Sequence, residues 1–286
     1  MSSSSPRTYD ELDPAPPWPA SRLYHDNSKL TERRAEVLRE QIELFAADTG
    51  GAPAGQSRYP SRPTIALPRA KRRLFGARLD DMLRERRSQR GPFASRPLAL
   101  TELGALLDLA LATSREPAPP TKTKSEEKPA EARALRPFPS AGGLYPVEVY
   151  VATLSCTAIE RGIHHYDPVK HALAKVSSCP AKSELERLIF ADDLWDHAAA
   201  ALVFTGVFER AQAKYGERGY RFVLLEAGHA AQNVLLAAQS LGLAGAPIGG
   251  FCEDALGAAM GLEAAKESPL YVVLLGGRDR RAEASS

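Results

Sequence analysis

Apolar side chains recur every three or four residues in several stretches, the spacing that places them on one face of an α-helix. The helices predicted in this way cover residues 30–48, 78–88, 101–113, 183–190 and 221–241. Thr101 and Ser183 stand where two of these helices begin. Each is predicted to be an N-cap, because a hydroxyl oxygen can accept a hydrogen bond from a free amide of the first turn.

The predicted helix at 221–241 is apolar over most of its circumference. Its polar residues are confined to a narrow stripe made of Glu226, His229, Asn233 and Ser240. A helix with this pattern is expected to be buried on nearly all sides, either within one domain or between two subunits.

Shorter apolar runs predict the strands of a sheet. The segment 147–153 alternates in part, and 162–166 with 172–176 flank the turn signal Asp167-Pro168, which predicts a hairpin. Continuously apolar runs at 201–207 and 271–275 are typical of central strands. Because helices and strands do not alternate regularly, the order predicts an α+β fold with helices flanking the sheet.

Other segments carry no periodic pattern. Residues 1–22 are predicted to be a disordered or extended N-terminal arm, 49–70 an extended connection, 115–132 a flexible loop and 281–286 a disordered tail. The motifs on both sides of 115–132 are expected to serve one site. Residues 23–280 are therefore predicted to form a single domain.

Composition narrows the class of protein. The 286 residues include 44% hydrophobic and 25% charged residues, as in ordinary globular proteins, and the net charge of +2 gives no field that marks nucleic acid or a membrane as a partner. The three cysteines form no CxxC pair and the histidines no HExxH motif, so no metal site is predicted. With no signal peptide and no apolar run of membrane-spanning length, we expect a cytoplasmic protein.

Two groups of cations could hold an anion. Arg86, Arg87, Ser88 and Arg90 combine guanidinium groups with a hydroxyl, and such side chains suit phosphate oxygens. Arg278 follows the last strong strand and could add a further cation. Taken alone, each group is more typical of a solvated basic surface.

Two glycine-containing segments could approach a flat ligand closely. In the first, Ser140 could bond a polyol or ring edge, while Gly142 and Gly143 permit close approach and positive φ. In the second, Gly249 and Gly250 could offer N–H groups to a ligand. The alternatives are a tight turn before the strand at 147 and a plain helix-to-strand connection.

Lys214 and Tyr215 immediately precede the long apolar helix. A lysine in a partly desolvated site can act as a base, and a neighbouring tyrosine can donate or relay a proton. In isolation, a Lys-Tyr dipeptide is far more typical of a surface role.

Read together, these segments resemble the nitroreductase superfamily of FMN enzymes and, more narrowly, the SagB/McbC-type azoline dehydrogenases of thiazole- and oxazole-modified peptide biosynthesis. The matching strings are LYHDNSKL (23–30), RRSQRGPF (86–93), PSAGGLYPVEVYV (139–151), GIHHYDPVKHAL (162–173), KYGERGYRFVLLEAGHAAQNVLLAAQSLGL (214–243) and PIGGF (247–251).

The resemblance implies a mainly antiparallel sheet flanked by helices, in an intertwined homodimer with FMN at the subunit interface. Arg86, Ser88, Arg90 and Arg278 would then contact the phosphate, with Arg87 beside them. Ser140, Gly142 and Gly143 would lie beside the flavin, and Gly249 and Gly250 would face its N5 atom. Lys214 and Tyr215 match the catalytic pair of the azoline dehydrogenases.

The function implied is oxidation of peptide thiazolines or oxazolines to thiazoles or oxazoles, with FMN as hydride acceptor and dioxygen as reoxidant. A cyclodehydratase is a possible partner. Since no added leader-peptide-binding domain is recognised, peptide recruitment would need a partner protein or a short surface groove. Two alternatives stay open: an NAD(P)H-dependent nitroreductase or quinone reductase on the same fold, and a flavin-free scaffold subunit of a peptide-cyclising complex.

Overall fold

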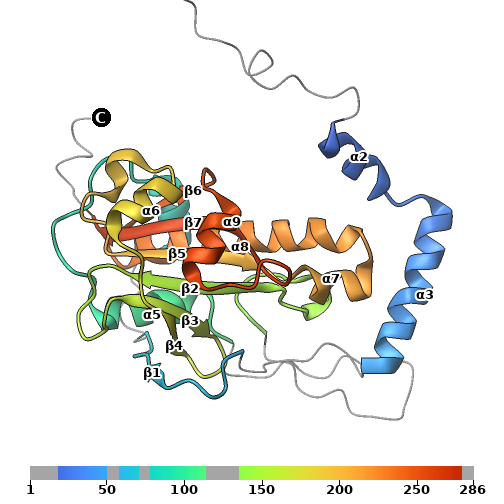
Figure 1. Ribbon diagram of the computed structural model, residues 1–286, viewed down its shortest axis with the longest axis horizontal. Coiled ribbons are helices and arrows are strands. Elements are labelled where there is room, and N and C mark those ends of the chain that lie inside the picture. Colours follow the sequence, from blue (N-terminus) through green and yellow to red (C-terminus); the bar gives the residue numbers. More distant parts are fainter. Residues whose placement is uncertain (1–18, 50–57, 71–77, 114–134, 279–286) are drawn as a thin grey trace, which may run out of the picture.

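The computed structural model describes residues 19–49, 58–70, 78–113 and 135–278. Its centre is one seven-stranded sheet in the order β1-β4-β3-β2-β5-β7-β6, and every pairing in it is antiparallel (Figure 1). The strands are β1 (Thr64–Ala66), β2 (Val147–Thr153), β3 (Gly162–Asp167), β4 (Ala172–Ser177), β5 (Ala200–Gly206), β6 (Leu243–Ile248) and β7 (Ser268–Gly277).

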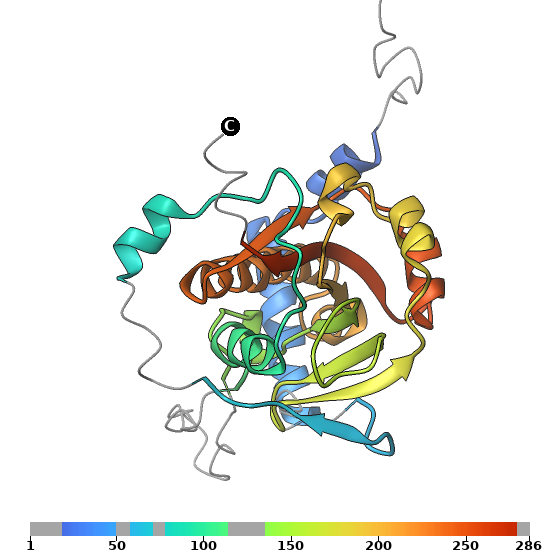
Figure 2. The ribbon, with the colours of Figure 1, turned by 90° about the vertical axis from the view of Figure 1, so that its left-hand side faces the viewer.

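Helices cover both faces of this sheet. Figure 2 looks along the layers, with α5 and α8 on one side of the sheet and α6 and α9 on the other. The helices are α2 (Ala20–Asn27), α3 (Glu32–Thr49), α4 (Leu79–Glu85), α5 (Leu100–Ala110), α6 (Lys182–Leu188), α7 (Phe208–Tyr215), α8 (Arg218–Ser240) and α9 (Glu253–Met260), with short 3₁₀ turns at Ala141–Gly143 and Asp192–Trp195.

Alternation along the strands divides the core into two clusters. Val149 and Val151 of β2 face α5 and α8, whereas Tyr150 and Ala152 between them face the layer of α6 and α9. Both faces of β2 and β5 are therefore buried, which explains why their sequences read as almost continuously apolar.

The sequence pattern located most of these elements. The structure confirms the α+β class and the antiparallel sheet, the predicted helices and strands, and the hairpin of β3 and β4. In that hairpin the Asp167 carboxylate accepts hydrogen bonds from the amides of Val169 and Lys170, at 3.0 Å each. The predicted loop 115–132 and tail 281–286 lie outside the described residues, as do residues 1–18 of the predicted arm, whose last residues, 20–22, are helical.

Both predicted N-caps were wrong. Helix α5 begins one residue before Thr101, and its capping partner is Glu102, which accepts a hydrogen bond from the Ala99 amide at 2.9 Å. Ser183 lies inside α6, whose N-cap position is Ala181. In both places the hydroxyl residue is one of the first helical residues and not the residue before them.

The segment after α8 was also misread. The segment of Gly249 and Gly250 was interpreted as a connection between a helix and a strand, but the residues just before it, Leu243–Ile248, form the edge strand β6, paired with β7. Pro247 is tolerated there because an edge strand has one side without a partner strand. Strand β1, inside the predicted connection 49–70, was missed because it is only three residues long.

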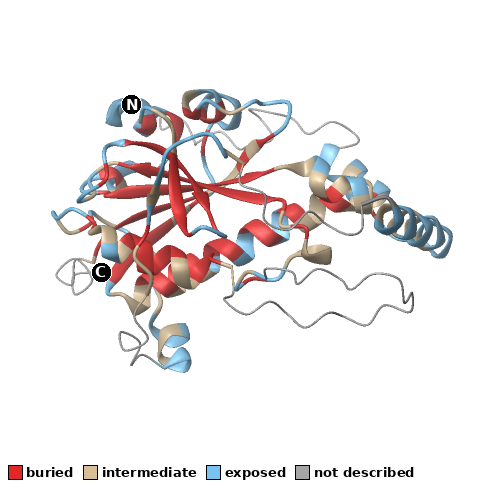
Figure 3. Ribbon diagram, turned by 90° about the horizontal axis from the view of Figure 1, so that it is seen from below, coloured by how far each residue is buried: buried red, intermediate tan, exposed pale blue. Residues whose placement is uncertain are grey.

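Helix α8 is not buried on all sides within one chain. Leu224 and Leu225 are 43% and 58% exposed, and His229 of the predicted polar stripe lies on the same exposed face. Figure 3 shows that α8 is buried on the face toward the sheet and has exposed positions on its outer face. Packing within one domain therefore buries this helix only in part.

The N-terminal helices form an arm at one end of the molecule. Helix α3 extends from the main body and is mostly exposed (Figure 3). It contacts the core through α7, where the Gln41 amide donates a hydrogen bond to the Ala213 carbonyl at 3.2 Å. Within the described residues, no helix is long and apolar enough to cross a membrane.

Candidate active site

Two predicted segments leave the sheet at the same edge. Val147, the first residue of β2, pairs with Gly206, the last residue of β5. The loop before β2 and helix α7 after β5 therefore emerge side by side, and the Val207 amide donates to the Pro146 carbonyl at 2.9 Å. This pairing brings the segment of Ser140 to the segment of Lys214.

Gly142 lies directly against the Lys214-Tyr215 pair. A Cβ atom built on Gly142 would meet the Tyr215 hydroxyl at 2.5 Å and the Lys214 amine at 2.8 Å. Gly142 also has φ of +63°, a conformation that other residues rarely adopt. The position therefore requires glycine for two reasons, and it places the predicted flavin loop beside the predicted proton-transfer pair.

The two side chains of the pair stand among aromatic rings. Lys214 Nζ lies 5.8 Å from the centre of the Phe45 ring on α3, and the rings of Tyr215 and Phe222 are 5.0 Å apart, edge to face. Both Lys214 and Tyr215 are half-buried. A lysine side chain among aromatic rings is partly desolvated and still reachable from outside.

Arg210, one turn before Lys214 on α7, ties this helix to the loop. Its guanidinium donates to the Tyr145 carbonyl at 2.5 Å and to the Glu148 carboxylate at 2.7 Å. His165 Nε2 lies 2.9 Å from the other Glu148 oxygen. Burial alone would raise the pKa of Glu148, but His165 and Arg210 outweigh it and lower the pKa to about 2.

Glu226 of α8 supports the same loop from beneath. Its Oε1 accepts a hydrogen bond from the Val147 amide at 3.2 Å, and the carboxyl also interacts with Ser140, whose Oγ accepts from the Tyr145 amide at 2.9 Å. Burial raises the pKa of Glu226 to about 7 against the opposing effect of Ser140 and Val147. Its Oε2 atom has no hydrogen-bond partner among the described residues. A carboxylate here would lack a donor on that oxygen, which disfavours the charged form in the same direction as burial does.

The predicted phosphate-binding residues lie at the opposite end of the sheet. The Gln89 amide donates to the Gly245 carbonyl at 3.0 Å, which attaches the segment after α4 to β6. Arg87 and Arg278 then line one small cavity together with Gln89 and the end of α8. Two arginines that are distant in the sequence are thereby gathered at one place.

The remaining residues of this group lie just outside that cavity. The Arg86 guanidinium donates to the Ser88 hydroxyl at 3.3 Å, and Arg90 is exposed. All of them follow the end of α4 at Glu85, so the helix predicted for 78–88 is shorter than expected. Gly249 and Gly250 lie beyond the other end of β6, where both are exposed and the Gly250 carbonyl accepts from the Phe190 amide at 2.9 Å.

One chain does not unite the two groups. Tyr215 lies just before α8, whereas Leu235 and Gln239 of its last turns line the cavity of Arg87 and Arg278. At 1.5 Å per residue, the helix between them is about 30 Å long. The structure thus contains two separate halves of the predicted site, one at each end of α8.

Sequence reasoning missed the buried and half-buried polar residues behind the site. Glu148, Arg210 and Glu226 were given no role, although a carboxylate inside an apolar strand or helix is itself a signal, because charges are rarely buried without a partner. Among the described residues, no group of three or more His, Cys, Asp or Glu could hold a metal ion.

Comparison with known proteins identifies the family. The model of the nitroreductase family matches residues 83–277, which is more than half of the chain. The chain therefore belongs to the nitroreductase family, whose members are oxidoreductases that bind FMN.

Individual relatives agree with this assignment. The chain is 32% identical to MJ1384 of Methanocaldococcus jannaschii, named as a nitroreductase, over 199 residues, which are 70% of this chain and 90% of that protein. It is 34% identical over 146 residues to the microcin B17-processing protein McbC of Escherichia coli, covering 49% of this chain and 54% of McbC. The solved E. coli microcin synthetase McbBCD complex with truncated pro-MccB17 bound shares the fold, with a TM-score of 0.54 and 23% identity over 88% of this chain and 98% of that chain.

Proposed function

We propose that this protein is an FMN-dependent azoline oxidase, which converts thiazolines or oxazolines in a modified peptide to thiazoles or oxazoles. The observation that carries the proposal is the contact of the Gly142 turn with the Lys214 amine and the Tyr215 hydroxyl. A base, a hydrogen-bond donor and a ligand-binding turn then meet at one point, as removal of a ring proton beside a flavin requires.

The likeness to McbC supports a peptide as the substrate. That E. coli protein processes microcin B17, and its match to this chain covers about half of its length. On this basis a cyclodehydratase that forms the ring is the expected partner.

The arginine end of the molecule fits the phosphate of FMN in charge. Arg87 and Arg278 share a cavity of about 10 Å³, which has room for one water molecule at most. A phosphate would therefore lie at its mouth, within reach of Arg86, Ser88 and Arg90. Gly249 and Gly250, exposed beyond β6, would offer backbone N–H groups to the ring system, and Ser140 and Gly143 would flank it.

Bound FMN would supply a two-electron acceptor that takes hydride from the azoline ring and passes the electrons to dioxygen. Lys214 would take the proton that leaves the ring carbon, and Tyr215 would donate a hydrogen bond to the same substrate. Arg210 holds α7 against the loop through Tyr145 and Glu148, which fixes where the Lys214 amine can reach.

The separation of the two halves supports a homodimer. A second copy that packs on the exposed face of α8 could bring its arginine end to the Lys214 end of the first copy. Leu224 and Leu225 on that face are apolar and exposed in one chain, as expected of a surface that another protein covers.

The direct test is a Lys214→Ala substitution in the purified protein, assayed with a thiazoline peptide. Loss of a general base typically lowers the rate about 10²- to 10⁴-fold, while flavin absorbance in the protein fraction should stay unchanged. Lys170→Ala, in the exposed hairpin turn, is the control and should retain full turnover. Unchanged oxidation by Lys214→Ala protein would refute the assignment.

A nitroreductase activity is the second candidate, because the match to MJ1384 covers 90% of that protein. It predicts rapid bleaching of bound flavin on mixing with NADPH, with no need for Lys214. A stopped-flow experiment with wild-type and Lys214→Ala protein separates the two functions, since only the nitroreductase should bleach equally in both.

A further inference from the structure

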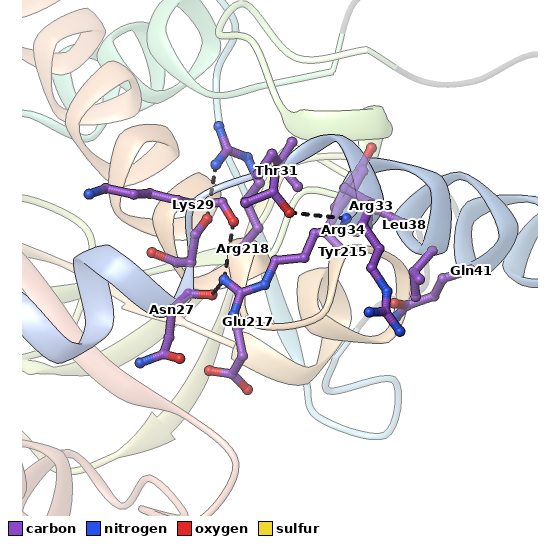
Figure 4. A pocket seen from close by; sticks show the side chains of 13 residues that line it. Asn27, Lys29, Thr31, Arg33, Arg34, Leu38, Gln41, Tyr215, Glu217 and Arg218 are labelled. Carbon is purple, nitrogen blue, oxygen red and sulfur yellow. Dashed lines mark hydrogen bonds between the residues drawn. The ribbon is translucent and has the colours of Figure 1, made fainter.

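A second cavity lies on the other side of Tyr215, between the N-terminal arm and the start of α8. It has a volume of about 420 Å³ and is open to solvent. Its walls come from the end of α2, the first turns of α3 and the junction of α7 and α8 (Figure 4). Tyr215 lines this cavity and also places its hydroxyl against Gly142, so the cavity adjoins the candidate active site.

The lining of the cavity is strongly cationic. Lys29, Arg33, Arg34 and Arg218 lie around it, against one carboxylate, that of Glu217. The acidic residues Glu36 and Glu40 of α3 do not line it. Such an excess of one charge in a concave site attracts ligands of the opposite charge.

Most of this positive charge is not neutralised within the protein. The Arg34 guanidinium donates to the Asn27 carbonyl at 2.8 Å and that of Arg218 to the Ser28 carbonyl at 3.0 Å, and both acceptors are neutral. Lys29 differs, since it pairs with Asp26 at 2.6 Å. Arg33 is exposed and makes no side-chain hydrogen bond or ion pair with any described residue.

Contacts between the α2–α3 segment and the start of α8 fix the positions of these cations. Arg221 donates to the Ser28 hydroxyl at 2.8 Å and to the His25 carbonyl at 2.9 Å, and Tyr24 packs edge to face on Tyr220. These contacts hold the segment between α2 and α3 on the first turn of α8. The string LYHDNSKL therefore fixes one wall of the cavity beside Tyr215.

We propose that this cavity binds an acidic segment of the peptide substrate, next to the ring that reacts at Tyr215. The inference rests on the proposed function and adds the substrate's charge to it. Side-chain carboxylates on the residues that flank the azoline would meet Arg33, Arg34 and Arg218, while Val37 and Leu38 of α3 offer apolar contact. The cofactor phosphate does not need this site, because Arg87 and Arg278 lie at the other end of α8.

The test uses two synthetic thiazoline peptides that are identical except that the flanking residues are Asp and Glu in one and Asn and Gln in the other. Wild-type protein should show a KM about tenfold lower for the acidic peptide at low salt, with kcat within twofold. Arg33→Gln should raise KM for the acidic peptide about threefold and Arg33→Glu about tenfold, and neither should change KM for the neutral peptide.

The control is Arg39→Glu, an exposed arginine of the same helix that does not line the cavity. It makes the same change in net charge and should leave both peptides unaffected. Equal KM values for the two peptides with wild-type protein, or equal effects of Arg33→Glu and Arg39→Glu, would overturn the proposal. So would a result in which Arg33→Glu raises the KM for NADPH and for neither peptide, because it would assign the cavity to a dinucleotide.

Fluorescence anisotropy of the same two peptides, each carrying a label, measures their affinity for the protein without turnover. If neither peptide is oxidised but the acidic one binds wild-type protein more tightly and Arg33→Glu protein about tenfold more weakly, the azoline oxidase fails and the anion site stands. If the neutral peptide is oxidised and acidic residues give no advantage in either assay, the oxidase stands and the anion site fails.

Discussion

The two ends of helix α8 differ in how their polar groups are held. At its N-terminal end, Arg210, Glu148 and His165 form a buried chain of hydrogen bonds behind the loop that touches Lys214 and Tyr215. At its C-terminal end, Arg87 is exposed and its guanidinium donates to the neighbouring carbonyls of Arg84 and Arg86.

This difference matches two kinds of task. A group that moves a proton must be fixed to within a fraction of an ångström, so neighbouring residues brace it before the substrate arrives. A cationic site for a phosphate can acquire its order when the anion binds, because each guanidinium gains strong charge-assisted hydrogen bonds at that moment. We therefore expect rigidity at the first end to matter for rate, and charge at the second end to matter for affinity.

The largest expected effect comes from placing the substitutions of the two ends in different copies of the chain. Lys214→Ala protein should be inactive or nearly so when assayed alone, and so should an arginine-deleted variant in which Arg86, Arg87, Arg90 and Arg278 are all changed to Ala. If one site takes Lys214 from one copy and these arginines from the other, a mixed dimer keeps one intact site. Equal mixing with subunit exchange should then restore about a quarter of wild-type azoline oxidation.

The control mixes Lys214→Ala protein with the arginine-deleted variant that also carries Lys214→Ala, so that no combination has an intact site. If the test mixture stays at the level of this control, each chain assembles its own site. That result would remove the main argument for a homodimer.

A smaller but still large loss is expected from Gly142→Ala. The added methyl group would collide with the Tyr215 hydroxyl and the Lys214 amine, so azoline oxidation should fall about 10- to 100-fold. Gly242→Ala is the matched control, because Gly242 also has a positive φ, of +69°, but a Cβ there would meet no atom within 4 Å. Equal losses in the two variants would attribute the effect to backbone strain and not to displacement of the pair.

The polar residues at the N-terminal end of α8 should also affect how the stability of the protein depends on pH. The pKa of Glu226 is raised to about 7, so the native state retains a proton that the unfolded chain has lost above its ordinary value of 4.5. Stability is therefore greatest below about pH 4.5 as far as this group is concerned, and it should fall by roughly 3 kcal/mol as pH rises through 7. The pKa of Glu148, lowered to about 2, acts in the opposite sense and removes stability only as pH falls below about 4.5.

Urea unfolding of wild-type and Glu226→Gln protein at pH 5, 6, 7 and 8 measures this effect. The neutral amide should flatten the decline, and Glu217→Gln, on an exposed carboxyl, should not. Parallel curves for wild-type and Glu226→Gln protein would mean that Glu226 is ionised and compensated in the native state.

The smallest expected effect is on FMN affinity at the C-terminal end of α8. Arg278→Ala should weaken FMN binding about tenfold, because one charge-assisted contact is lost while Arg86, Arg87 and Arg90 remain. The measurement is the flavin retained by the protein in equilibrium dialysis. Lys182→Ala, an exposed lysine of α6 on the side of the sheet opposite to α8, serves as the control, and equal affinities would exclude Arg278 from the phosphate site.

Much of the fold could be predicted because its signals are local. The pattern of Val147–Thr153 follows from a strand that is buried on both faces, and the turn at Asp167 follows from a carboxylate that caps its own backbone amides. Strand β6 was missed because Pro247 and the glycines that follow it suggest a loop, and only pairing with β7 makes Leu243–Ile248 a strand. Both caps were misplaced by two residues, because packing of the whole helix, and not the presence of a hydroxyl, decides which residue begins it.

The sequence alone determined which residue types are available: the arginine group, the glycine turns, the Lys214-Tyr215 pair and the long apolar helix that follows it. Only the tertiary structure decided which of them meet. The pairing of Val147 with Gly206 brings Gly142 to Lys214, and the attachment of Gln89 to Gly245 brings Arg87 to Arg278. Helical and strand patterns report neighbours a few residues away, whereas these meetings depend on the register of distant strands, on which local periodicity carries no information.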